Sequence, residues 1–156
     1  MGYPDAMITI REAGPGDVDA ILRLVRESAV SQSEPDAVCI DAPLLRDEMF
    51  GARARVHALL AIDEGRAIGL ALYFFLFSTW FSVNAIHLED LYVDGASRRH
   101  GVGAALMRAL ADVASARGCG RVQWFVQRRN ADAIRFYESV GAHAADDWTI
   151  MHLDPA

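Results

Sequence analysis

The spacing of apolar residues along the chain predicts alternating strands and helices. Residues 8–13 alternate in the manner of a short strand, and residues 18–30 place apolar side chains on one helical face. Residues 67–77 are apolar at nearly every position, which is typical of a strand covered on both faces. In chain order, the pattern predicts strands at 8–13, 57–63, 67–77, 86–93, 121–126 and 148–153, and helices at 18–30, 44–50, 104–117 and 131–140.

The order of these elements predicts the fold class. Asp17 and Asn130 are predicted helix N-caps, and Gly51 and Gly141 are predicted to end helices. Neither an internal repeat nor a linker interrupts the series, so we expect a single α/β domain over residues 1–156. Its central sheet is expected to be twisted, mixed and mainly antiparallel, with flanking helices, and residues 1–6 are expected to be a loose tail.

Composition and charge argue against several classes of partner and indicate a compartment. The formal net charge is −6, with 21 acidic residues against 15 Lys and Arg, which argues against a nucleic-acid surface. No apolar run reaches the length of a membrane span, and no secretory signal begins the chain, so we expect no membrane partner. Two distant cysteines, Cys39 and Cys119, indicate a reducing compartment, and we expect the cytoplasm. The histidines show no metal-ligand spacing, and we expect no metal.

The segment Arg98-Arg99-His100-Gly101-Val102-Gly103 lies between a predicted strand and a predicted helix. A turn at this place exposes backbone N–H groups that have no helical acceptor, and the helix dipole favours an anion there. From Arg98 to Ala104 these N–H groups suit a phosphate or diphosphate, and glycine lets the anion approach closely. The Gly-Lys-Ser/Thr of a Walker loop and the third glycine of a dinucleotide fingerprint are both absent. An ordinary helix-entry turn remains the alternative.

The spacing Arg-x-x-Gly-x-Gly resembles the coenzyme A diphosphate loop of the GCN5-related N-acetyltransferases. Three further stretches carry the same resemblance. Leu88-Glu89-Asp90-Leu91-Tyr92-Val93 and Tyr73-Phe74-Phe75 followed by Trp80 are similar to strands of the diamine (spermidine/spermine) acetyltransferase branch, and residues 130–142 are similar to the family's Asn…Phe-Tyr…Gly-Ala helix. The resemblance implies the fold of this family, with a strand–loop–helix site for acetyl-coenzyme A (acetyl-CoA) as co-substrate.

The resemblance also implies roles for individual residues. The coenzyme would be bound by the Leu91, Tyr92 and Val93 strand, by Arg98, Arg99, His100, Gly101, Val102, Gly103 and Ala104, and by Asn130 and Tyr137. Tyr137 would donate a proton to the leaving thiolate, because a phenol can supply one late in the step. Packing of Tyr137 in the core, and helix capping alone by Asn130, are the competing interpretations.

Glu89 and Asp90 are the candidates for taking the proton of the acceptor ammonium. Adjacent strand residues point to opposite faces, so only one of them can face the acceptor unless the strand bulges. The branch resemblance favours Glu89 as the proton acceptor and Asp90 for nearby structure or substrate charge. Tyr73 and Trp80 are expected to line the acceptor channel, with core packing equally compatible.

These residues predict an enzyme that transfers an acetyl group directly to a primary amine of a small molecule: a polyamine, a diamine or a lysine-like amino acid. The alternatives are an acetyltransferase for an aminoglycoside or a protein amine, and a non-catalytic acyl-CoA-binding regulatory module. The resemblance also implies a homodimer, with residues 148–153 as the candidate edge.

Overall fold

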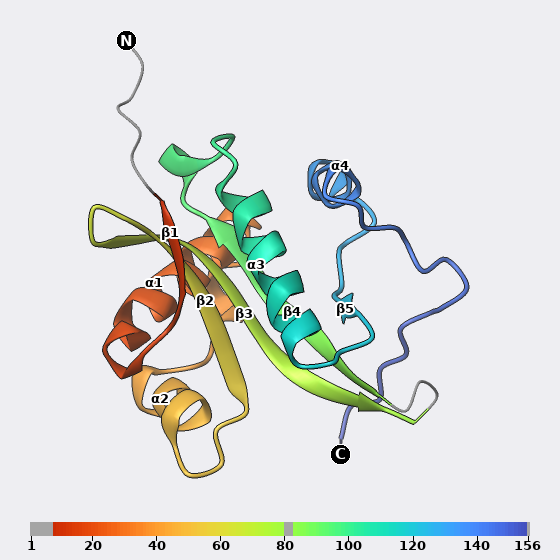
Figure 1. Ribbon diagram of the computed structural model, residues 1–156, viewed down its shortest axis with the longest axis horizontal. Helices are drawn as coiled ribbons and strands as arrows, with labels where there is room; N and C mark the ends of the chain where they lie inside the picture. The colour runs from red at the N-terminus through yellow and green to blue at the C-terminus, as the bar shows by residue number, and fades with distance from the viewer. Residues whose placement is uncertain (1–7, 80–82, 156) are drawn as a thin grey trace. The chain divides into compact units, whose positions relative to one another are not determined.

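The computed structural model describes residues 8–79 and 83–155, in two compact units that span Met1–Phe125 and Val126–Ala156. The first unit is built on a five-stranded sheet in the order β1-β2-β3-β4-β5 (Figure 1). Its strands are β1 (Thr9–Glu12), β2 (Val56–Asp63), β3 (Arg66–Ser78), β4 (Val83–Val93) and β5 (Val122–Gln123). The first four strands are antiparallel neighbours, and β5 runs parallel to β4. The prediction of an α/β fold with a mixed, mainly antiparallel sheet is confirmed.

A tight turn joins β2 to β3. Glu64 and Gly65 both have positive φ, at 46° and 80°, as a hairpin turn that follows the strand twist requires. An added Cβ on Gly65 would meet no atom within 4 Å, so backbone conformation alone favours glycine there.

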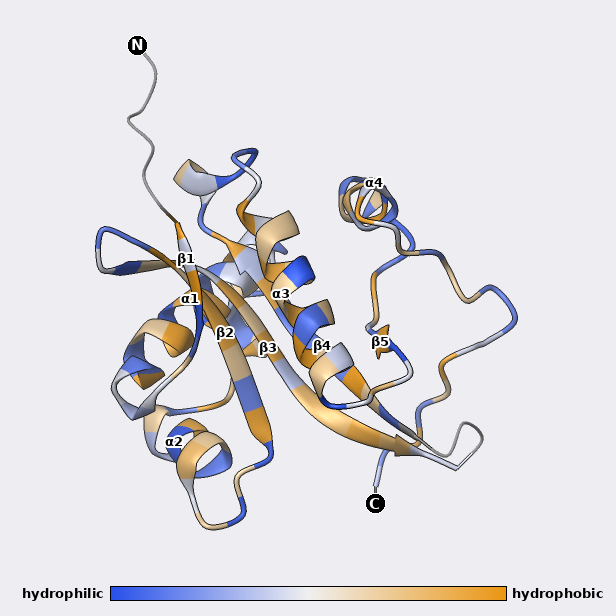
Figure 2. Ribbon diagram, viewed as in Figure 1, coloured by the Kyte–Doolittle hydropathy of each residue, from blue (hydrophilic) through white to orange (hydrophobic). Residues whose placement is uncertain are grey.

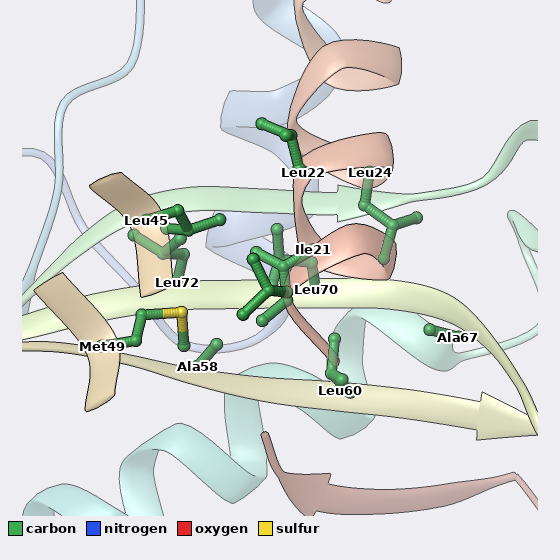
Figure 3. Packing of buried hydrophobic residues seen from close by; sticks show 11 residues of the cluster. Ile21, Leu22, Leu24, Leu45, Met49, Ala58, Leu60, Ala67, Leu70 and Leu72 are labelled. Carbon is green, nitrogen blue, oxygen red and sulfur yellow. The ribbon is translucent and has the colours of Figure 1, made fainter. Parts of the chain in front are cut away.

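The helices α1 (Val18–Ser31) and α2 (Ala42–Phe50) bury their apolar side chains against one face of the sheet. Figure 3 shows Ile21 and Leu24 of α1 beside Leu60 and Leu70 of the sheet. These four side chains are fully buried, and burial on this scale contributes about 1.5–3 kcal/mol for each large aliphatic side chain.

The helix α3 (Val102–Ala116) covers the other face. Gly69 of β3 faces it, and a Cβ on this glycine would lie 3.1 Å from Cδ1 of Leu106. The absence of a side chain therefore lets α3 pack closely on the sheet, at the end of the sheet where β4 leads into the helix. Figure 2 shows the central strands β2 and β3 as mostly hydrophobic, in agreement with cover on both faces.

Three sequence predictions need correction. Residues 148–153 form no strand, and their apolar side chains Trp148, Ile150, Met151 and Leu153 are exposed. A strand needs a neighbouring strand for its backbone hydrogen bonds, and no strand among the described residues pairs with this segment. β5 covers two residues instead of the six predicted. Asp17 occupies the N-cap position of α1 without capping it, because its carboxylate instead accepts hydrogen bonds from Arg11 and from the Gly14 N–H.

The described residues of the second unit include the helix α4 (Ala131–Ser139), which Asn130 caps through a hydrogen bond from the Ala133 N–H to Oδ1 (3.2 Å). None of the helices in the described part of the chain is both long and apolar enough to cross a membrane.

Candidate active site

A connection leads from β4 to α3 (Figure 1). It contains a buried aspartate, Asp94, which fixes its conformation. Oδ1 of Asp94 accepts a hydrogen bond from the Ser97 N–H (3.1 Å), and Oδ2 lies 3.0 Å from a guanidinium nitrogen of Arg66. The Asp94 N–H donates to the Ile68 carbonyl (2.9 Å), which ties the end of β4 to β3. Sequence reasoning missed Asp94; an aspartate that ends a strand three residues before a serine is the signal that could have found it.

The predicted anion-binding loop follows Ser97 and ends on an uncapped helix. Arg99 and Gly101 have positive φ, at 62° and 79°, and the Gly101 N-cap gives α3 no side-chain cap. The first N–H groups of α3 have no intrahelical acceptor, and they carry the positive end of the helix dipole. His100 and both arginines of the loop are exposed. This donor set fits a diphosphate.

Arg98 lies in this loop and also contacts two residues of β4. Its Nε donates to the Val93 carbonyl (2.9 Å), and its guanidinium carbon lies 5.3 Å from the centre of the Tyr92 ring. Arg98 therefore holds the loop against the end of β4, while its charge adds to the positive mouth of the loop.

β4 has a free edge between the middle of the strand and the loop. Its pairing with β5 covers only Ile86 and His87. Leu91, Tyr92 and Val93, which sequence reasoning assigned to coenzyme binding, pair with β3 on one side and have no strand partner on the other among the described residues. An extended ligand could lie along this edge as an additional strand would.

A β-bulge interrupts the pairing of β3 with β4 at the two carboxylates. Leu72 pairs with Asp90, and Tyr73 pairs with Leu88, so Glu89 is the extra residue. Asp90 lies on the face of Leu72, which is the face covered by α1 and α2.

Glu89 reaches the same face as Asp90. Its Oε2 lies 3.5 Å from Nε2 of His87, and His87 pairs with Phe74, which shares the face of Leu72. The bulge therefore brings both carboxylates to one side of the strand.

The two carboxylates differ in environment. Burial, together with the nearby charge of Glu89, raises the pKa of Asp90 to about 6. Glu89 is exposed at the side chain and lies beside His87, which is buried between the rings of Phe74 (4.9 Å) and Phe125 (5.0 Å). Asp90 is thus a stronger base than an ordinary aspartate, and Glu89 is the carboxylate in contact with water.

Replacing Asp90 with asparagine should stabilise the protein at neutral pH. The native protein retains a proton on Asp90 up to about pH 6, whereas the unfolded chain releases it near 3.8, so the native state loses stability as the pH rises through this window. We expect Asp90→Asn to increase the free energy of unfolding by about 2–3 kcal/mol at pH 7. Urea unfolding at pH 7 and pH 4 measures this change in the free energy of unfolding, with the substitution Asp112→Asn at an exposed position as a control. A gain as large at pH 4 as at pH 7 would contradict this origin.

The structure does not bring Tyr73 together with the carboxylates. Tyr73 follows Leu72 along β3 and so lies on the opposite face, buried beside His57 (5.5 Å) and Phe75 (5.9 Å). Trp80, the other residue predicted to line the acceptor channel, lies outside the described residues.

Tyr137 and Asn130 belong to the second unit. Tyr137 lies on α4 with its ring 5.3 Å from that of Phe136, and burial raises the pKa of its phenol. A raised pKa keeps the phenol protonated at neutral pH, as a proton donor requires.

A groove of about 590 Å³ lies between α1 and the end of β4, and sequence reasoning missed it. Its lining includes Asp19, Leu22, Arg23, Arg26, Glu27 and Tyr92. The helical residues recur at intervals of three and four and so share one side of α1. No group of three His, Cys, Asp or Glu that could hold a metal occurs in the part of the chain that the structure describes.

A free strand edge and a following loop that enters a helix match the strand–loop–helix arrangement that the sequence resemblance implied, and a bulge, which the sequence left open, adds two carboxylates beside the edge. The model of the acetyltransferase (GNAT) family matches residues 20–142. The chain belongs to this family. It is a GNAT N-acetyltransferase, and the family implies the use of acetyl-CoA.

Relatives of this GNAT enzyme confirm the predicted branch. The thialysine N-epsilon-acetyltransferase of Sus scrofa is 35% identical over 154 residues, covering 92% of this chain and 90% of that protein. The spermidine/spermine N(1)-acetyltransferase-like protein 1 of Homo sapiens is 31% identical over 85% of this chain and 20% of its own length. A solved aminoglycoside acetyltransferase from an uncultured soil sample has a TM-score of 0.80 at 18% identity, covering 97% of each chain, and this likeness concerns the fold.

Proposed function

We propose that this enzyme transfers an acetyl group from acetyl-CoA directly to the primary amine of a small diamine, polyamine or lysine-like amino acid. One observation carries the proposal: the bulge in β4 puts two carboxylates next to a free strand edge that leads into the uncapped N-terminus of α3. The similarity to a thialysine acetyltransferase over 92% of the chain supports the acceptor class.

The chain's residues fit the coenzyme as follows. The backbone N–H groups from Arg98 to Ala104 bind the diphosphate, and the edge of β4 at Leu91–Val93 orients the pantetheine arm. When bound, acetyl-CoA supplies the acetyl group as a thioester. A free N–H on this edge of β4 stabilises negative charge on the carbonyl oxygen, an effect typically worth about 3 kcal/mol.

The acceptor ammonium must lose a proton before it can attack, because an alkyl amine is charged at pH 7. The sequence favoured Glu89 for this step. The structure supports a shared role in which Asp90, with a pKa of about 6, accepts the proton and Glu89 passes it to water.

Tyr137 is proposed to donate a proton from Oη to the sulfur that leaves as the C–N bond forms and the C–S bond breaks. Asn130 is proposed to bind the pantetheine, although its Oδ1 is engaged in the helix cap. We propose that residues 1–156 form one acetyltransferase domain. The family match over residues 20–142, which spans both units, supports it.

We propose a homodimer, supported by the exposed apolar side chains of Trp148, Ile150, Met151 and Leu153. The two free cysteines support a reducing compartment such as the cytoplasm.

A panel of amines tests the proposed function. Purified protein with acetyl-CoA should acetylate thialysine, lysine, ornithine or a diamine, and mass spectrometry should find the acetyl group on a primary amine. An aminoglycoside and a peptide with a free amine are the comparison acceptors. Turnover restricted to those two acceptors would refute the acceptor class, and coenzyme binding without any transfer would indicate a regulatory module.

A further inference from the structure

Apart from Tyr92, whose strand edge is proposed to orient the coenzyme, the groove beside α1 is lined by residues that the proposed mechanism does not use, and it has its own charge pattern. Two arginines and two acids line it. Arg23 is already engaged, because one guanidinium nitrogen lies 2.8 Å from Oε1 of Glu27 and the other donates to the Ala67 carbonyl (2.6 Å). Arg23 and Glu27 therefore neutralise each other inside the groove.

Arg26 and Asp19 differ from that pair. Both are exposed, and neither has a hydrogen bond or ion pair with another described residue. They lie seven residues apart on α1, about 10 Å along the helix. The groove thus offers one uncommitted cation and one uncommitted anion to a ligand.

The groove also lies at the right distance from the carboxylate pair. Tyr92 pairs with Leu70, and Asp90 pairs with Leu72, so both side chains lie on the face that α1 covers. Two residues along a strand span about 7 Å. The carbon chain between the ε-amine and the α-carbon of lysine has a similar reach, at about 1.5 Å for each bond. An amine beside Asp90 would place the other end of such a molecule near Tyr92 and α1.

We infer that this groove binds the α-amino-acid end of the acceptor, with Arg26 pairing with its α-carboxylate and Asp19 with its α-ammonium. The inference rests on the proposed function and selects within its acceptor class: an amino acid with a terminal amine is preferred over a plain diamine or polyamine. The far end of a polyamine is cationic and could pair with Asp19, but it would leave Arg26 without an anionic partner. An α-carboxylate supplies that partner, because it forms a charge-assisted, bidentate pair with a guanidinium.

The test compares two matched acceptors. One is thialysine, and the other is the diamine that remains when the carboxyl group of thialysine is removed. We expect the wild-type enzyme to acetylate thialysine with a kcat/KM at least about tenfold higher than that of the diamine. Arg26→Gln should remove this preference by lowering kcat/KM for thialysine, mainly through KM, while kcat/KM for the diamine is unchanged or rises. Arg26→Lys should restore part of the preference, because lysine keeps the positive charge but cannot form the bidentate hydrogen bonds of a guanidinium.

Arg108→Gln is the control, since Arg108 is an exposed arginine on α3. The Arg108→Gln enzyme should prefer thialysine over the diamine as strongly as the wild type does. The inference would be overturned if the Arg26→Gln enzyme kept the full preference, or if its kcat/KM fell equally for both acceptors. Neither result would contradict the proposed function. A wild-type enzyme that acetylates neither compound would refute the proposed function itself, and the inference with it.

Discussion

Replacing Tyr137 with phenylalanine should lower kcat for amine acetylation by about a hundredfold or more. The substitution removes one oxygen, so the leaving sulfur must take its proton from water, and a positioned general acid typically contributes 10²–10⁴-fold. The phenol of Tyr137 is protonated at neutral pH, since its ordinary pKa already lies above 7 and burial raises it further. Steady-state kinetics with thialysine as acceptor measures the effect.

The affinity for coenzyme A serves as the internal control for this variant. Calorimetry should give the same Kd for Tyr137→Phe as for the wild type, because the ring is retained and the diphosphate loop is elsewhere in the sequence. An unchanged kcat would remove Tyr137 from the mechanism. A lower affinity at unchanged kcat would assign it to coenzyme binding instead.

Replacing Gly101 with alanine should weaken coenzyme A binding by at least about tenfold. Gly101 has φ of 79°, and a Cβ at this angle costs about 1–2 kcal/mol whatever space surrounds it. The variant can relieve this strain by turning the peptide at the start of α3, which would move the N–H groups away from the diphosphate. Calorimetric titration with coenzyme A measures the loss.

Gly65→Ala is a matched control for Gly101→Ala. Gly65 has φ of 80° in the β2–β3 hairpin, and an added Cβ meets no atom within 4 Å at either glycine. Both variants should lose similar stability in urea unfolding, but only Gly101→Ala should lose affinity. Equal affinities in the two variants would show that the loop does not bind the diphosphate.

The sequence was sufficient to predict the strand, the loop and the helix from β4 to α3, because each part carries a local signal. Alternation gives the strand, the glycines give the turn, and the alanine- and leucine-rich run gives α3. The antiparallel part over residues 57–93 was equally accessible, since the Asp63–Arg66 turn and the apolar run after it predict consecutive hairpins. The pairing of β1 with β2 was not predicted.

The features that the sequence could not give depend on partners distant in the chain. The bulge at Glu89 exists only in the register of β4 against β3. From the sequence, Glu89 and Asp90 could be predicted to share a face only if the strand bulged there. The placement of Tyr73 on the far face depends on that register too. The groove beside Tyr92 needs α1 packed against β4, and no local pattern reports that contact.

The C-terminal prediction failed for a related reason. Residues 148–153 alternate like a strand, but alternation shows only which side chains could share a face. A strand also needs a neighbour for its backbone hydrogen bonds, and the described residues provide none for this segment.

A crystal structure of the protein with coenzyme A tests the central claim most directly. The account predicts that the diphosphate oxygens accept hydrogen bonds from backbone N–H groups between Arg98 and Ala104, with the pantetheine along the Leu91–Val93 edge and its sulfur near Asp90. A coenzyme bound away from this loop, or one whose sulfur lies on the α3 face beside Tyr73, would contradict it.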